Sequence, residues 1–255
     1  MPMTKRIGFV CEGPTDAQVF SSIIGHLFPD DPIKYVPIQP DENFRSDLYT
    51  GWKGVLRWCH ENGPRIDSFL TEINPPLDAL IVHLDADVSR KDKESHCYCG
   101  SVVCPHKDSV SPPDCTYYKE CPIILPCGEH PGSPQGYVNH LIGVLASLFP
   151  DQHAMPVIFV IPCDETETWI VAALDDYEDY EQILNPWESI ILANRYNYHG
   201  VRNSKCKKSR KVFKELIDLM IPNWERVTSN CPQAKKFHDD IKQLLKPPED
   251  QSVSP

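Results

Sequence analysis

Carboxylates follow three separate apolar runs of this chain. Glu12 ends the first run, Asp85 and Asp87 follow the second, and Glu165 and Glu167 lie just beyond the third. In open parallel α/β sheets, ligands bind outside the carboxyl ends of the strands. We therefore expect these acids to meet at one edge of a sheet and to form a catalytic site there.

The Asp-x-Asp spacing of Asp85 and Asp87 suits a hard divalent cation. Beyond a strand end, residues two apart can turn toward one point, and Mg²⁺ takes one or two protein carboxylates while keeping several waters. Such an ion, Mg²⁺ or Mn²⁺, neutralises a phosphoryl oxygen, activates water and stabilises a leaving oxygen. Glu12 is then expected to act as a general base or as a further metal ligand.

Apolar runs separated by helical patterns predict the scaffold that positions these acids. The runs are near-continuous rather than alternating, so they predict an α/β fold with a mostly parallel four-stranded sheet flanked by helices. Thr15 is expected to be the N-cap of the first helix. The expected strands are 6–11, 34–39, 79–84 and 156–162. The expected helices include 15–27, 46–60, 66–73, 137–149, a segment ending at 174, and stripes around 212–220 and 237–245.

The chain divides into four parts by composition and periodicity. Residues 1–88 and 135–176 are expected to form the α/β core, and 89–134, where periodicity is lost, to be an insert. Residues 177–246 are expected to be helical, and 247–255 to be a disordered tail.

Bulk properties restrict the class of protein. A chain of 255 residues can bury a full core. It holds no apolar run near the ~20 residues of a membrane span and begins without a signal peptide, so we expect a cytoplasmic protein without membrane contact. The net charge of −11 argues against a general nucleic-acid coat but permits an enzyme with one local basic patch.

One dense basic segment stands out in this acidic chain. Its side chains are expected either to contact phosphate beside the acidic site or to form a solvated face. The candidate phosphate-binding residues are Lys205, Lys207, Lys208, Arg210 and Lys211.

Six of the eleven cysteines lie between positions 97 and 127. Crowded thiols in a reducing compartment favour a structural Zn²⁺ site over disulfides, and such a site can organise a segment that lacks a hydrophobic core. Free thiols in a loop are the alternative. The first-choice ligands are Cys97, Cys99, Cys104 and Cys115, with Cys121, Cys127 and His106 as substitutes.

The order of these motifs resembles the TOPRIM domain of topoisomerases, primases and overcoming-lysogenisation-type nucleases. Residues 12–16 read Glu-Gly-Pro-Thr-Asp and residues 165–169 read Glu-Thr-Glu-Thr-Trp. These segments resemble an uncharacterised bacterial TOPRIM-like family, domain of unknown function 4276, although Asp16 stands where that family often has Glu. The resemblance spans most of the chain outside the insert.

The resemblance implies roles for the acids and for partners. Glu12 would be the acid/base residue, Asp85 and Asp87 would bind Mg²⁺, and Glu165 or Glu167 would complete the site. The implied function is a Mg²⁺-dependent nuclease of DNA or RNA in a bacterial anti-phage defence system. It would work beside a separately encoded ATPase, since this chain has no Walker A motif.

Two other readings stay open. A haloacid-dehalogenase-like phosphatase would use Asp85 as its nucleophile, although it assigns no role to Glu12. A non-catalytic TOPRIM-like module would use its zinc insert to dock a partner protein.

Overall fold

The computed structural model describes residues 4–40, 50–90, 133–193 and 206–245. The predicted α/β class is confirmed: a four-stranded sheet has the order β2-β1-β3-β4, and every strand pair is parallel. The strands are β1 (Lys5–Val10), β2 (Ile33–Gln39), β3 (Ala79–His83) and β4 (Val157–Val160). The Cys-rich residues 91–132 and the tail 246–255 lie outside the described residues, so the zinc-binding insert stays a prediction.

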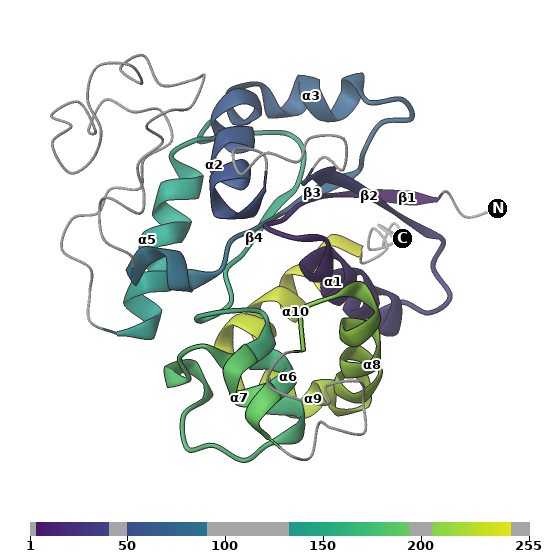
Figure 1. The fold of residues 1–255 in the computed structure, drawn as a ribbon. Helices are drawn as coiled ribbons and strands as arrows, with labels where there is room; N and C mark the ends of the chain where they lie inside the picture. Colours follow the sequence, from purple (N-terminus) through teal and green to yellow (C-terminus); the bar gives the residue numbers. More distant parts are fainter. Residues whose placement is uncertain (1–3, 41–49, 91–132, 194–205, 246–255) are drawn as a thin grey trace, which may run out of the picture.

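Helices cover both faces of the sheet (Figure 1). One face carries α2 (Gly51–Asn62), α3 (Ile66–Glu72) and α5 (Pro134–Ala146). The other face carries α1 (Pro14–Leu27), α6 (Glu167–Leu174), α7 (Pro186–Leu192), α8 (Arg210–Met220), α9 (Trp224–Asn230) and α10 (Pro232–Leu245). Short 3-10 turns are η2 (Gly63–Arg65), η3 (Ala86–Arg90), η5 (Tyr180–Gln182) and η7 (Ile221–Asn223).

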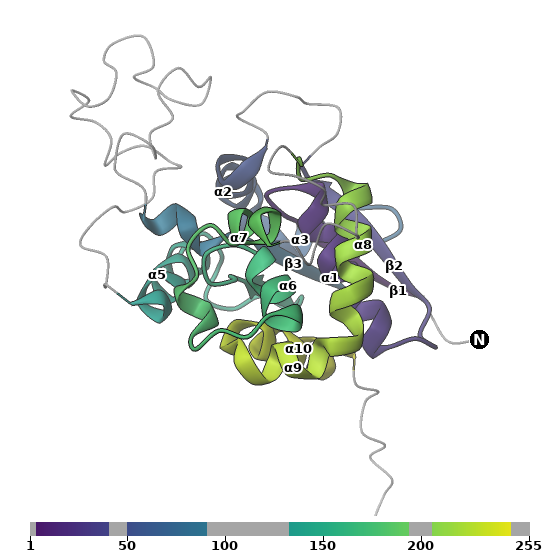
Figure 2. The same ribbon diagram turned by 60° about the horizontal axis from the view of Figure 1, so that its bottom comes forward.

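Alternation along the strands divides the core into two hydrophobic clusters. Ile7 and Phe9 of β1 face the cluster formed with α1, α6, α8 and α10, whereas Val10 faces the cluster formed with α2, α3 and α5. Successive strand side chains point to opposite faces, so a strand buried on both sides reads as one apolar run. The helices α8, α9 and α10 share their cluster with β1, and Figure 2 shows α8 lying beside α1.

Trp169 of α6 is the largest fully buried side chain of the described residues. Its ring lies against Phe20 of α1 at 5.8 Å, Trp224 of α9 at 5.7 Å and Phe237 of α10 at 6.0 Å between ring centroids. The helix that follows the third acidic segment is therefore anchored in the core.

The start of α1 differs from the sequence-based prediction. Gly13, not Thr15, is the N-cap, with Pro14 in the first turn, and the Asp16 carboxylate accepts a hydrogen bond from Gly13 N at 2.8 Å. Pro is favoured in a first helical turn because its missing N–H has no partner there. The bend after β1 thus depends on Asp16.

Within the described ranges, no helix is both long enough and apolar enough to cross a membrane.

Candidate functional site

Glu12 and Asp85 meet at the carboxyl ends of two neighbouring strands. Because β1 and β3 are adjacent and parallel, with Val10 opposite Val82, their following residues leave the sheet side by side. The main-chain N–H of Asp85 donates to Glu12 Oε1 at 2.8 Å. The N–H of Gly51, at φ +62°, donates to the Glu12 carbonyl at 3.0 Å and links the start of α2 to the same point.

In each of these two carboxylates, one oxygen atom accepts hydrogen bonds from the described residues and the other does not. Asp85 Oδ1 accepts from Thr166 N at 3.1 Å and contacts His83 Nε2 at 3.1 Å. Across the residues that the structure describes, no hydrogen-bond donor is bonded to Asp85 Oδ2 or Glu12 Oε2. Both side chains are half-buried, so these oxygens can receive a ligand.

His83 is fully buried and lies between acids. Its Nε2 also lies 3.1 Å from Thr166 Oγ1, and its Nδ1 lies 3.9 Å from Asp16 Oδ2. Burial alone lowers the pKa of His83, but Asp85 and then Asp16 outweigh burial and raise that pKa to about 9. The two carboxylates thus favour the protonated form of the ring, which offsets part of the acidic charge.

His83 is not among the site residues predicted from the sequence. It is in the core, but it also bonds to the site. Residues two apart on a strand point the same way, so a polar residue two positions before Asp85 in an otherwise apolar run was the available signal. Asp16 and Thr166 were missed as site residues in the same way, although both lie within the recognised motifs.

The loop after β4 brings the third acidic segment to Asp85 through Thr166. Asp164 adopts a left-handed conformation with φ 61°, and its Oδ2 accepts from Asn185 N at 2.8 Å. This turn directs Glu165 and Glu167 toward Lys208, whose Nζ lies 3.0 Å from Glu165 Oε2 and 2.5 Å from Glu167 Oε1.

Only one described residue of the predicted basic segment contacts the acids, and three others lie on the exposed surface. Lys208 reaches the acids and also lies over the Trp187 ring, 5.9 Å from its centroid. Lys207, Arg210 and Lys211 are exposed, and Lys205 lies outside the described residues. Lys208 is thus placed beside the acidic edge, with its ammonium paired with Glu165 and Glu167.

Crowding raises the pKa values of several acids. Burial, followed by Asp85, raises the pKa of Glu12 well above its ordinary value. Burial raises the pKa of Glu167 to about 8 against the opposing effect of Lys208, and raises that of Asp16 to about 6 against His83. The pKa of Glu165 is raised by burial too. Perturbed acids of this kind concentrate at functional sites, where a cation favours their charged forms.

Asp87 follows Asp85 by two residues and is bonded through its main chain to the loop after β4. It is half-buried at the start of η3, and its N–H donates to the Asp164 carbonyl at 3.0 Å. Among the described residues, no three His, Cys, Asp or Glu side chains form a set arranged to hold one metal ion. The chemistry of Glu12 and Asp85 nevertheless fits Mg²⁺, which needs only one or two protein carboxylates. All the predicted zinc ligands lie outside the described residues.

Comparisons with protein-family models, with curated proteins and with solved structures found no match to this chain.

Proposed function

We propose that this protein is a TOPRIM-like nuclease that hydrolyses phosphodiester bonds in DNA or RNA with the help of Mg²⁺. The supporting observation is the hydrogen bond from the main-chain N–H of Asp85 to Glu12 Oε1, which brings together two acidic residues from neighbouring strand ends. The proposal also draws on the TOPRIM resemblance of the acidic motifs, with which a parallel four-stranded sheet flanked by helices is compatible. Function rests on this site, since the fold alone is compatible with many activities.

Each residue has a role in this proposal. Asp85 and Asp87 would bind the ion, and Glu12 would be either a further ligand or the general base. The bound Mg²⁺ would supply charge neutralisation at the phosphoryl oxygens. As general base, Glu12 would accept the proton of the attacking water on Oε2, because its Oε1 already accepts a hydrogen bond from Asp85 N.

Lys208 is the phosphate-binding residue of this proposal. Its side chain is 39% exposed, so its ammonium can meet a phosphate oxygen while it stays bound to Glu165 and Glu167. Lys207, Arg210 and Lys211 extend the positive charge along the surface that the nucleic acid would follow.

The cellular setting in the proposal comes from the resemblance. It comprises a bacterial anti-phage system in the cytoplasm, in which a separately encoded ATPase would supply the nucleotide-driven step that this chain lacks.

A divalent-dependent cleavage assay tests the proposal. Supercoiled plasmid, single-stranded DNA and RNA are incubated with Mg²⁺ or Mn²⁺, using wild type, Glu12→Gln and Asp85→Asn. Both variants are expected to lose at least about 100-fold in rate, the range for a general base or a charge-stabilising group. Asp218→Asn, at an exposed position of α8, is the matched control and should cleave normally.

Other results of the same experiments would contradict the nuclease proposal or favour the docking module or the phosphatase. Cleavage that survives in both variants contradicts the proposal. No cleavage together with stable co-purification of a larger subunit favours the docking module. A phosphate trapped on Asp85 favours the phosphatase.

A further inference from the structure

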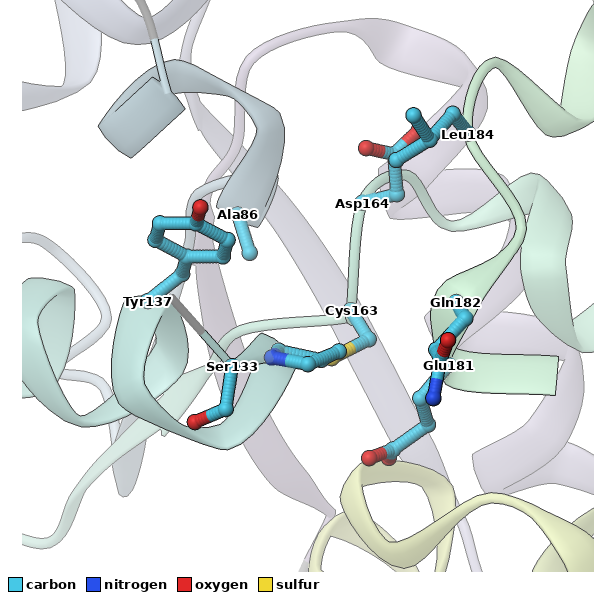
Figure 3. A pocket seen from close by; sticks show the side chains of 9 residues that line it. Ala86, Ser133, Tyr137, Cys163, Asp164, Glu181, Gln182 and Leu184 are labelled. Carbon is cyan, nitrogen blue, oxygen red and sulfur yellow. The ribbon is translucent and has the colours of Figure 1, made fainter. Parts of the chain in front are cut away.

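A cavity of about 420 Å³ lies next to the acidic edge, on the other side of the residues that follow β3. Figure 3 shows Tyr137 and Ala86 on one side, Leu184, Gln182 and Glu181 on the other, and Cys163 between them. The pocket is built at the carboxyl ends of β3 and β4, where α/β sheets bind ligands.

The pocket and the acids share the same short stretch of backbone. Ala86, which lines the pocket, stands between Asp85 and Asp87 and donates through its N–H to the Pro162 carbonyl at 3.1 Å. Asp164 lines the pocket as well, and its carbonyl accepts from Asp87. The backbone of residues 85–87 therefore carries the proposed metal ligands and forms part of the pocket wall.

The lining selects a particular class of ligand. Tyr137 and Leu184 offer flat and apolar contact area, whereas the polar groups are mainly carboxylate and amide oxygens. Glu181 lines the pocket with a buried carboxylate, whose pKa is raised by burial and then by Asp179, and lowered by interactions with the main chain of Gln233 and with Cys163. Acidic walls repel a phosphate, but they accept hydrogen bonds from ring N–H and amino groups.

We propose that this pocket holds one unpaired nucleobase of the nucleic acid whose phosphodiester lies at Glu12 and Asp85. The inference rests on the proposed function for its substrate and adds to it the substrate class. A base inside a duplex is stacked and paired, so it enters such a pocket only from a single strand or after flipping out. The preferred substrate is therefore single-stranded, or locally unpaired, next to the cleaved bond.

Binding without cleavage tests the inference. Fluorescence anisotropy in EDTA compares a labelled single-stranded oligonucleotide with an equally long strand of abasic residues and with a duplex. The natural single strand is expected to bind about 5- to 150-fold more tightly than the abasic strand, the range for stacking of a base on an aromatic ring. Tyr137→Ala should remove this difference, and Tyr137→Phe should keep it.

Two variants that each add one surface carboxylate, Leu184→Asp and Leu192→Asp, control for an effect of the new charge on folding. Leu184 is 59% exposed at the pocket, and Leu192 is 66% exposed and does not line it. Leu184→Asp should weaken binding of the natural single strand at least about 5-fold, whereas Leu192→Asp should not, because only the first removes apolar contact area from the base. Equal affinities of these two variants, or equal binding of natural and abasic strands by wild type, overturn the inference.

The experiments distinguish failure of the nuclease proposal from failure of the nucleobase pocket. Base-dependent binding that Leu184→Asp weakens, without any cleavage by wild type, supports the pocket and removes the nuclease. Glu12-dependent cleavage with equal binding of natural and abasic strands supports the nuclease and removes the pocket.

Discussion

His83 Nε2 lies 3.1 Å from Asp85 Oδ1, and both residues come from the carboxyl end of the central strand β3. The ring is fully buried against Phe20, with ring centroids 5.0 Å apart, so its position is set by core packing. Packing of the hydrophobic core thereby fixes which oxygen of Asp85 is bonded inside the protein and which oxygen is left for a ligand.

This contact predicts that His83 positions Asp85 for metal binding. His83→Leu should lower Mn²⁺ affinity by about 10- to 100-fold, as losses of outer hydrogen bonds to metal ligands do. His83→Gln, which retains a donor, should recover part of that affinity. Electron paramagnetic resonance of free and bound Mn²⁺ measures the effect, and an unchanged affinity in a folded His83→Leu protein would contradict the prediction.

Lys208 is expected to stabilise the fold through Glu167. Glu167 is 2% exposed, so Lys208→Met leaves a buried acid without its cation. We expect a loss of about 1–3 kcal/mol in unfolding free energy at pH 8, below the usual cost of breaking a buried pair because Lys208 is 39% exposed.

Two controls accompany this measurement by urea unfolding. Lys208→Met combined with Glu167→Gln should regain most of the loss, since no buried charge is left. Lys214→Met breaks an exposed pair with Asp218 and should leave the unfolding free energy nearly unchanged. Equal losses in the Lys208 and Lys214 variants would show that the buried pair adds nothing.

Stability without metal is expected to fall as the pH rises from about 5 to 9. Glu167 has its pKa raised from 4.5 to about 8 and His83 from 6.5 to about 9, so the folded state holds more protons than the unfolded state in this range. Each retained proton contributes a slope of at most about 1.4 kcal/mol per pH unit. Glu167→Gln should flatten the slope between pH 5 and 8, and thermal unfolding in EDTA across the pH range measures it.

Divalent ions are expected to stabilise wild type through the acidic edge. At 100 times its dissociation constant, Mg²⁺ adds about 2.7 kcal/mol if it binds only the folded state. Glu12→Gln and Asp85→Asn should reduce this gain, and NaCl at equal ionic strength serves as the control for screening. A gain of equal size in all proteins would place the ion elsewhere.

Zinc analysis addresses the Cys-rich segment. Protein purified without chelators is expected to carry about one zinc per chain, as a single tetrahedral site requires. Cys99→Ser should lower the zinc content, and Cys206→Ser, outside that segment, should not. Metal-free protein from such a preparation would remove the zinc prediction.

Local patterns of apolar residues predicted the main strands and helices. The apolar runs predicted all four strands, because a strand covered on both faces needs apolar side chains on both. The positions of Glu12 and Asp85 at strand ends followed from the same runs. The prediction of Thr15 as the N-cap was wrong, because the helix begins two residues earlier, with Gly13 as the N-cap and Asp16 accepting from its N–H.

The sequence alone determined the fold class and which acids end which strands, because both depend on residue type and local period. The tertiary structure decided how these acids interact: the strand order sets Asp85 N against Glu12, and core packing sets His83 against Asp85. The left-handed turn at Asp164 is held by Asn185, and the pocket combines residues from 86 to 184. Such contacts join segments far apart in the chain, and no local pattern specifies them.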